Sequence, residues 1–197
     1  MPFSDLPRAD VPRGGSVYVV VRPGDAPPEL TAVSRAGRFK GKDPAVSLSA
    51  LQEAWVNGAE VLYIGKAIAG QGGRRGLRVR LDEYRRHGAG LPVGHWGGRY
   101  IWQLADADEL LVAWKETPGQ DPTAVEKAFI DDFVAPFDRK PFANRVLGSS
   151  QRTEPKVVLD RQGRPLTPRA HGSAGFLAGK RARMDEAHAA PLNIWEP

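Results

Sequence analysis

The residue most suggestive of chemistry is Glu126, which lies in a segment whose apolar side chains recur at helical spacing. On a helical wheel, Val125, Phe129, Ile130 and Phe133 form one stripe, and Glu126 falls inside it at about 100° from Val125. An isolated carboxylate on a buried face is costly, so it must be paired with a cation or bound to a metal ion. The helical geometry alone does not separate a metal ligand from a glutamate whose stem reaches an arginine at the edge.

A second group of capable side chains lies on the helix predicted over residues 77–87. Arg80, Tyr84 and His87 share one flank of that helix. A guanidinium offers planar, permanently charged donors that suit a phosphate. Taken alone, the pattern favours a simpler interpretation, a surface arginine packed along a tyrosine.

The elements that must position these residues alternate between strands and helices. β-Branched and aromatic runs predict strands over 16–22, 60–64, 99–104 and 110–114, the last two as a hairpin. Apolar periodicity predicts helices from Asp43-Pro44 to Asn57-Gly58, over 77–87, and from Asp121-Pro122 to Pro136. Both Asp-Pro pairs are typical of a helix N-terminus, where aspartate caps and proline occupies the first turn.

The chain of 197 residues is predicted to form one domain with appendages. Residues 1–15 hold three prolines and a Gly-Gly pair and are expected to be an irregular arm, so that the fold begins near Ser16. Residues 148–197 form a basic C-terminal extension, expected to contain a small hairpin around 160–163. The net charge of +5 and the pI near 9.7 favour acidic partners.

Several classes of function are excluded by what the sequence lacks. Without cysteine there are no disulfides, thiolate zinc sites or cysteine nucleophiles. No phosphate-binding glycine motif, nucleophile elbow or helical histidine doublet is present. No apolar stretch reaches the roughly 18 residues that a membrane span needs, and no signal-peptide core is present, so we expect a cytoplasmic protein without a membrane partner.

Five short motifs follow one another along the predicted elements. They are Ser16-Val17-Tyr18, Leu62-Tyr63-Ile64-Gly65-Lys66, Arg80-Leu81 with Tyr84, Glu126, and Lys140-Pro141-Phe142-Ala143-Asn144. In this order, over roughly residues 15–145, they closely resemble the GIY-YIG endonuclease family. The resemblance implies an α+β fold over 16–147, with a small central, mainly antiparallel sheet flanked by helices. It also favours Glu126 as a metal ligand over the ion-pair alternative.

The sequence departs from the family pattern in two places. Ser16 stands where the first motif usually has glycine. Tyr18 and Tyr63 are 45 positions apart, whereas the family usually joins these strands by a much shorter connection. Residues 23–59 are therefore expected to be an insertion with its own small helix, of a kind that helps restriction-type members grip duplex DNA.

The resemblance implies hydrolysis of phosphodiester bonds with one divalent metal ion. Glu126 would hold Mg²⁺, with Mn²⁺ as a substitute, and Tyr18 or Tyr63 would activate the attacking water. A phenol needs positive charge nearby to act as a base at neutral pH, and Lys66 and Arg80 are the available cations. Arg80 would also clamp the scissile phosphate, and the products would carry 5′-phosphate and 3′-hydroxyl ends.

Further roles are carried over to the neighbouring residues. Tyr84 and His87 would orient the water or take its proton, and His95 is an equally available histidine. Asn144 would hold the chain near the site by hydrogen bonds. The residues expected to contact DNA are Gly65, Lys66, Arg74, Arg75, Arg78, Arg80, Arg181 and Arg183.

The leading expectation is a restriction-like DNA endonuclease acting on double-stranded DNA. One alternative is a repair or recombination nuclease that recognises DNA structure. Another is a nucleic-acid-binding module that does not cut; it would be expected to lack Glu126 or Arg80, and both are present. A palindromic recognition site would imply a homodimer, because one active site cuts one strand at a time.

Overall fold

The computed structural model describes residues 1–24 and 26–144. With η marking a 3-10 helix, its elements are η1 (Phe3–Arg8), β1 (Ser16–Val21), α1 (Leu48–Ala54), β2 (Val61–Ala67), η2 (Gln71–Gly73), α2 (Leu77–Gly88), η3 (Arg99–Gln103), β3 (Leu111–Glu116) and α3 (Pro122–Phe137). Within this part of the chain, no helix combines the length and the apolar character needed to cross a membrane. The predicted extension 148–197, with its expected hairpin and with Arg181 and Arg183, lies outside the described residues.

The three strands form one antiparallel sheet in the order β2-β1-β3. The central strand β1 places Tyr18 opposite Gly65 of β2 and opposite Trp114 of β3. The predicted α+β class, with a small antiparallel sheet and helices, is confirmed. The strands are β-branched and aromatic, as a pleated surface packed on both faces requires.

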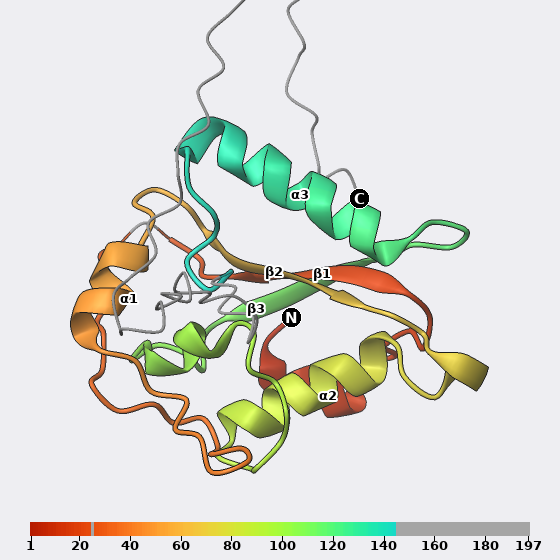
Figure 1. Ribbon diagram of the computed structural model, residues 1–197, viewed down its shortest axis with the longest axis horizontal. Coiled ribbons are helices and arrows are strands. Elements are labelled where there is room, and N and C mark those ends of the chain that lie inside the picture. Colours follow the sequence, from red (N-terminus) through yellow and green to blue (C-terminus); the bar gives the residue numbers. More distant parts are fainter. Residues whose placement is uncertain (25, 145–197) are drawn as a thin grey trace, which may run out of the picture. The chain divides into compact units, whose positions relative to one another are not determined.

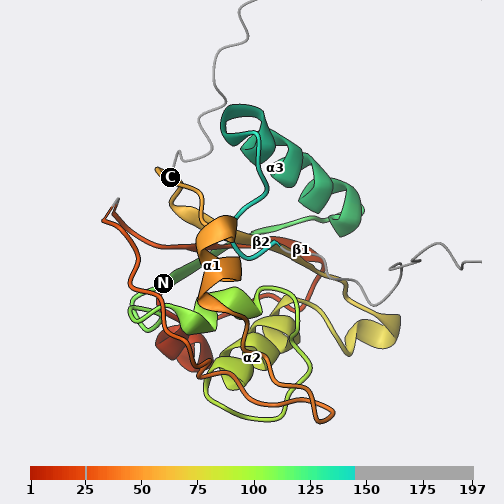
Figure 2. The same ribbon diagram turned by 60° about the vertical axis from the view of Figure 1, so that its left-hand side comes forward.

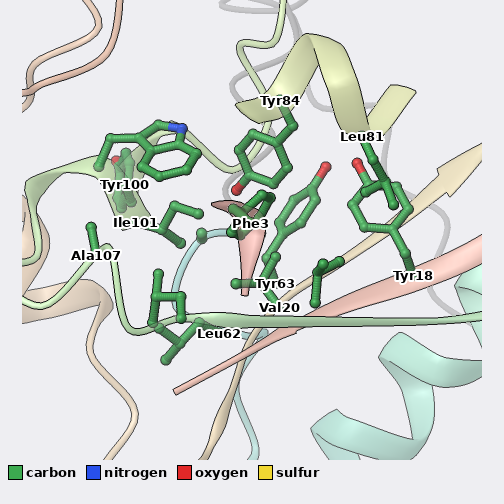
Figure 3. Packing of buried hydrophobic residues seen from close by; sticks show 14 of the residues in the cluster. Phe3, Tyr18, Val20, Leu62, Tyr63, Leu81, Tyr84, Tyr100, Ile101 and Ala107 are labelled. Carbon is green, nitrogen blue, oxygen red and sulfur yellow. The ribbon is translucent and has the colours of Figure 1, made fainter. Parts of the chain in front are cut away.

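Helices cover the two faces of the sheet (Figures 1 and 2). α3 lies on one face, where Val17, Ile64 and Phe133 belong to a single apolar cluster. α2 and η1 lie on the other face, over a larger cluster that includes Tyr18, Tyr63 and Tyr84. Figure 3 shows these three tyrosines side by side, with the hydroxyl groups of Tyr18 and Tyr63 pointing to the side of α2.

Both edge strands are covered by neighbouring chain, which removes free backbone groups that would otherwise pair with another sheet. On β3, the backbone N–H of Val112 donates to the carbonyl of Met1 over 2.7 Å. On β2, the backbone N–H of Ala143 donates to the carbonyl of Leu62 over 2.8 Å. The segments at 1–2 and 141–144 therefore belong to the sheet's framework.

Residues 1–15, expected to be an irregular arm, contain η1 and contribute Phe3, Leu6 and Val11 to the buried core. Phe3 packs edge-on against Tyr84 and Trp102, at centroid distances of 5.4 and 5.3 Å. The folded part of the chain therefore begins before Ser16. The prolines set the local backbone, but the apolar residues between them decide the packing.

Two predicted elements are wrong. The strand predicted over 99–104 is the 3-10 helix η3, which follows Gly98 in the left-handed region at φ 78°. Every side chain of η3 is buried, including Arg99 and Gln103, and a short, fully buried run has no periodicity that separates strand from helix. The predicted hairpin is absent because β3 pairs with β1 instead.

The inserted helix α1 begins later than predicted. Its N-cap is Ser47, whose Oγ accepts a hydrogen bond from the Ala50 backbone N–H, and not Asp43. The Asp43 carboxylate instead accepts from the N–H of Ala45, in a local turn. Buried Gln103 fastens the segment between β1 and β2: its Oε1 accepts from the N–H of Val46, and its Nε2 donates to the carbonyls of Thr31 and Val46.

Candidate active site

Two tyrosines from adjacent strands meet under α2. The rings of Tyr18 on β1 and Tyr63 on β2 lie 5.9 Å apart between centroids. Gly65 makes this possible, because a Cβ at that position would lie 2.7 Å from Cζ of Tyr18 and 2.7 Å from Cε1 of Tyr63. The glycine of the second motif thus provides space for the tyrosines of both strands.

Burial raises the pKa of both Tyr18 and Tyr63, and the charge of Arg80 on α2 acts in the opposite direction on each. Burial disfavours the charge of Arg80 itself, but Tyr18, Tyr63 and Glu83 outweigh burial and leave the pKa of Arg80 above its usual value. A nearby carboxylate oxygen of Glu83 lies 3.6 Å from Nη1 of Arg80. Arg80 is therefore a cation beside the two phenols.

Burial still dominates the titration of both phenols. It raises the pKa of Tyr18 well above the usual value near 10, and Tyr63 raises it further. Burial also raises the pKa of Tyr63, with a smaller contribution from Glu126. Both phenols are therefore protonated at neutral pH. Both rings are buried, but Tyr63, at 7% exposed, lines the open cleft described below, and Tyr18, at 1%, does not.

The histidine beside the tyrosines is His95, which lies in the loop after α2. Its Nε2 is 3.5 Å from the Tyr18 hydroxyl oxygen, and its ring stacks on that of Tyr84 at 3.8 Å with a 3° angle. Burial lowers the pKa of His95 well below its usual value, with further lowering by Arg80 and His87, so the ring is neutral at pH 7.

Arg80, Tyr84 and His87, which were expected to act from one flank of α2, do not all line the open cleft described below: Arg80 does, and the other two do not. Tyr84 is fully buried and donates its hydroxyl hydrogen to the carbonyl of Gly98 over 2.7 Å. His87 is also buried, and burial lowers its pKa. Neither residue lines the cleft, so the structure gives Tyr84 a positioning role and leaves His87 in the interior.

Glu126, near the N-terminus of α3, pairs with Lys66 of β2. Its Oε2 lies 2.6 Å from Nζ of Lys66, with 19% of the Glu126 side chain and 29% of the Lys66 side chain exposed. Asp121 caps α3 by accepting a hydrogen bond from the Thr123 N–H, which fixes the first turns of the helix over β2. The buried-face carboxylate therefore has its cation, a lysine instead of the arginine considered above.

These groups line one open cleft of about 360 Å³. Its walls are Tyr63, Lys66, Ala67, Ile68, Arg75, Gly76, Arg80 and Glu126. Five of the eight are site residues expected from the sequence: Tyr63, Lys66, Arg80 and Glu126 for the chemistry, and Arg75 as a DNA contact. Segments far apart in the chain therefore converge on a surface that carries three cations, one carboxylate and one phenol.

The donor set fits a hard cation held by few protein ligands. No hydrogen bond from the described residues reaches Oε1 of Glu126, while Oε2 is shared with Lys66. No group of three or more acidic or histidine side chains that would enclose a metal occurs in the same part of the chain. Mg²⁺ commonly keeps several waters and binds through one or two carboxylates plus substrate phosphate, which suits this arrangement.

Asn144 lies behind the cleft and acts on the backbone of β2. Its Oδ1 accepts from the N–H of Ile64 and its Nδ2 donates to the carbonyl of the same residue, each over 2.7 Å. The side chain thereby replaces a missing neighbouring strand next to Tyr63 and Gly65. It has the supporting contacts expected from the sequence and does not line the cleft.

Arginines extend from the cleft along the start of α2. Arg74, Arg75 and Arg78 are exposed, and Arg75 binds the Glu83 carboxylate with Nη2 at 3.0 and 3.1 Å from its two oxygens. Sequence reasoning missed Arg13, which lines the same surface, because nothing in the chain order places residue 13 beside 74–78. It also missed the narrow space at Gly98, where a Cβ would lie 2.3 Å from the Tyr84 hydroxyl oxygen.

The chain was compared with protein-family models, curated proteins and solved structures, and none of them matches it.

Proposed function

We propose that the chain is a metal-dependent DNA endonuclease with a GIY-YIG-like nuclease domain. The observation that carries the proposal is the convergence of Tyr63, Lys66, Arg80 and Glu126 on one open cleft, although they come from strand β2 and from two helices, α2 and α3. Three cations suit a phosphodiester, and one accessible carboxylate suits a hydrated divalent ion. The pI near 9.7 agrees with a polyanionic substrate.

Glu126 is the residue that would hold Mg²⁺ or Mn²⁺, and the metal ion would supply stabilisation of the negative charge that develops on the phosphate oxygens. Lys66 then exchanges the carboxylate for a phosphate oxygen as its partner. Arg80, which lines the same cleft, donates to the scissile phosphate, and its charge favours a pentavalent transition state.

Tyr63 is the phenol assigned to the attacking water, because it lines the cleft and Tyr18 does not. The raised pKa of Tyr63 means that it can accept a proton from the attacking water only after its own proton has passed to solvent in the open cleft. Glu126 contributes to that raised pKa, so neutralising its charge favours the phenolate. Tyr18 and His95 lie behind Tyr63, and Nε2 of neutral His95 is positioned to accept the Tyr18 hydrogen.

The test of this function is cleavage itself. Purified protein is incubated with supercoiled, linear and branched DNA in Mg²⁺, in Mn²⁺ and in EDTA, and the ends are mapped by sequencing. We expect metal-dependent cuts that leave 5′-phosphate and 3′-hydroxyl ends. Discrete sites on linear DNA would indicate a restriction-like enzyme, and cuts at branches a repair or recombination nuclease. Folded protein that binds DNA and cuts none of these substrates would contradict the proposal and favour a binding module.

A further inference from the structure

A second groove adjoins the candidate active site. It has a volume of about 420 Å³ and is lined by Arg13, Arg74, Arg75, Arg78, Val79 and Asp82. Arg75 lines both this groove and the cleft that holds Glu126. Four arginines from the N-terminal segment, the loop before α2 and the first turn of α2 thus form one surface, here called the arginine groove.

The backbone fixes Arg13 in this position. The N–H of Leu77 donates to the carbonyl of Gly14 over 3.2 Å, and the N–H of Arg78 donates to the carbonyl of Pro12 over 3.0 Å. Residues 12–14 thereby accept hydrogen bonds from backbone N–H groups in the first turn of α2, which have no partner within the helix. Gly76 permits this approach: its φ is 94°, and a Cβ there would lie 2.0 Å from the Arg13 carbonyl oxygen.

The charge in the arginine groove is largely uncompensated. Among the described residues, Arg13, Arg74 and Arg78 have no carboxylate within 4.0 Å, whereas Arg75 is paired with Glu83. The one acid in the lining, Asp82, is engaged by Arg85 at 2.8 Å and by Arg86 at 3.7 Å. Like charges this close repel one another, so the surface is electrostatically suited to a polyanion.

The contrast with other arginines of the chain supports this interpretation. Arg22, Arg35 and Arg38 each lie within 2.8 Å of an aspartate oxygen, as expected of arginines that stabilise a fold. Among the described residues, Arg8, Arg99 and Arg139 also lack a carboxylate within 4.0 Å, but only Arg13, Arg74 and Arg78 of this unpaired set line one groove beside the cleft. A nucleic-acid backbone satisfies this pattern better than a small anion, because successive phosphates can occupy both the cleft and the groove.

We propose that the arginine groove binds backbone phosphates of the DNA strand whose scissile phosphate lies in the Glu126 cleft, with Arg13 as a phosphate contact. This inference rests on the proposed function. Arg75 lines both sites and so connects them. Through Arg13, the N-terminal segment also becomes part of the DNA-binding surface. These contacts carry affinity and fix the strand's register, and they carry no base specificity.

The test measures DNA affinity without cutting. Glu126→Gln protein is titrated into fluorescent duplex DNA, followed by anisotropy between about 50 and 200 mM salt. Arg13→Gln and Arg74→Gln are each added to this background. The matched control is Arg139→Gln, an exposed arginine after the end of α3 that lines neither site and pairs with no residue of the groove. Thermal unfolding of each variant verifies that it is folded.

We expect Arg13→Gln and Arg74→Gln each to weaken binding about fivefold near 150 mM salt and to reduce the salt slope by about one. Arg139→Gln should leave both quantities unchanged. If the Glu126→Gln protein binds DNA and both groove variants match it in affinity and slope, the inference is wrong and the proposed function stands. If the Glu126→Gln protein and the unsubstituted protein fail to bind DNA at low salt, both are wrong.

Discussion

The ion pair between Lys66 and Glu126 leads to a prediction about metal affinity. Nζ of Lys66 lies 2.6 Å from Oε2 of Glu126, at the carboxylate that would hold the ion. A metal ion that uses this oxygen must first displace the ammonium group. Lys66→Met keeps much of the side chain's length and removes its charge, so it should strengthen metal binding in the absence of DNA.

The size of the effect follows from the exposure of the pair. With 29% of one side chain and 19% of the other exposed, the pair is partly solvated and is worth about 1 kcal/mol. Since about 1.4 kcal/mol corresponds to a tenfold change, Lys66→Met should tighten the metal dissociation constant about fivefold. Removing a positive charge from the cleft acts in the same direction.

The assay is titration of DNA-free protein with Mn²⁺, with free ion measured by electron paramagnetic resonance. Lys127→Met is the matched control, because Lys127 pairs with Asp131 on the exposed side of the same helix, where the two side chains are 74% and 60% exposed. We expect that control to bind Mn²⁺ like the unsubstituted protein. Unchanged or weaker binding by folded Lys66→Met protein would refute the reasoning.

Three further predictions concern the framework of the site. Asn144→Ala removes two hydrogen bonds of 2.7 Å to the backbone of Ile64. It should lower the free energy of unfolding, measured in urea, by about 2–3 kcal/mol at an unchanged m-value. A loss below about 0.5 kcal/mol would contradict the role given to Asn144. Gly65→Ala introduces a Cβ 2.7 Å from the rings of Tyr18 and Tyr63. It should destabilise the protein by about 1–3 kcal/mol and alter its near-ultraviolet circular dichroism. Unchanged stability and an unchanged spectrum would show that the space at residue 65 is not needed. Burial holds the pKa of His95 well below its unfolded value near 6.5, so the folded state favours the neutral ring. The free energy of unfolding should therefore be full above about pH 6.5 and should decline as the pH falls below that value. His95→Gln should flatten that decline, and an equal slope in both proteins would count against a buried neutral His95.

Much of the fold could be predicted because the strand and helix patterns are strong. The segments around Val17–Val21 and Leu62–Ile64 are β-branched or aromatic, and the stripe through Phe129 and Phe133 has a clear helical period. These patterns arise between residues that are close together along the chain, so they can be recognised from the sequence without knowledge of the fold. The run over Arg99–Gln103 was wrongly predicted as a strand because all its side chains are buried, Arg99 and Gln103 included, so no exposed face gives it a helical period.

The candidate site could be predicted only in part, for a different reason. The sequence singles out Glu126 because it is a carboxylate on an apolar helix face, and in the structure it forms an ion pair with Lys66. By contrast, His95 reaches Tyr18 through a loop, and Arg13 reaches α2 through backbone hydrogen bonds of residues 12–14. Contacts between loops depend on the packed chain and leave no periodic signal in the sequence.

The most direct test of the central claim is single-turnover DNA cleavage by Glu126→Gln protein. The substitution preserves the shape of the side chain and removes the charge that would hold the metal ion. Asp131→Asn is the matched control, a charge removed from the outer side of the same helix. The account predicts that Glu126→Gln protein binds DNA and loses cleavage by at least about 10²-fold, while Asp131→Asn protein cuts normally. Cleavage at the unsubstituted rate by Glu126→Gln protein would contradict it.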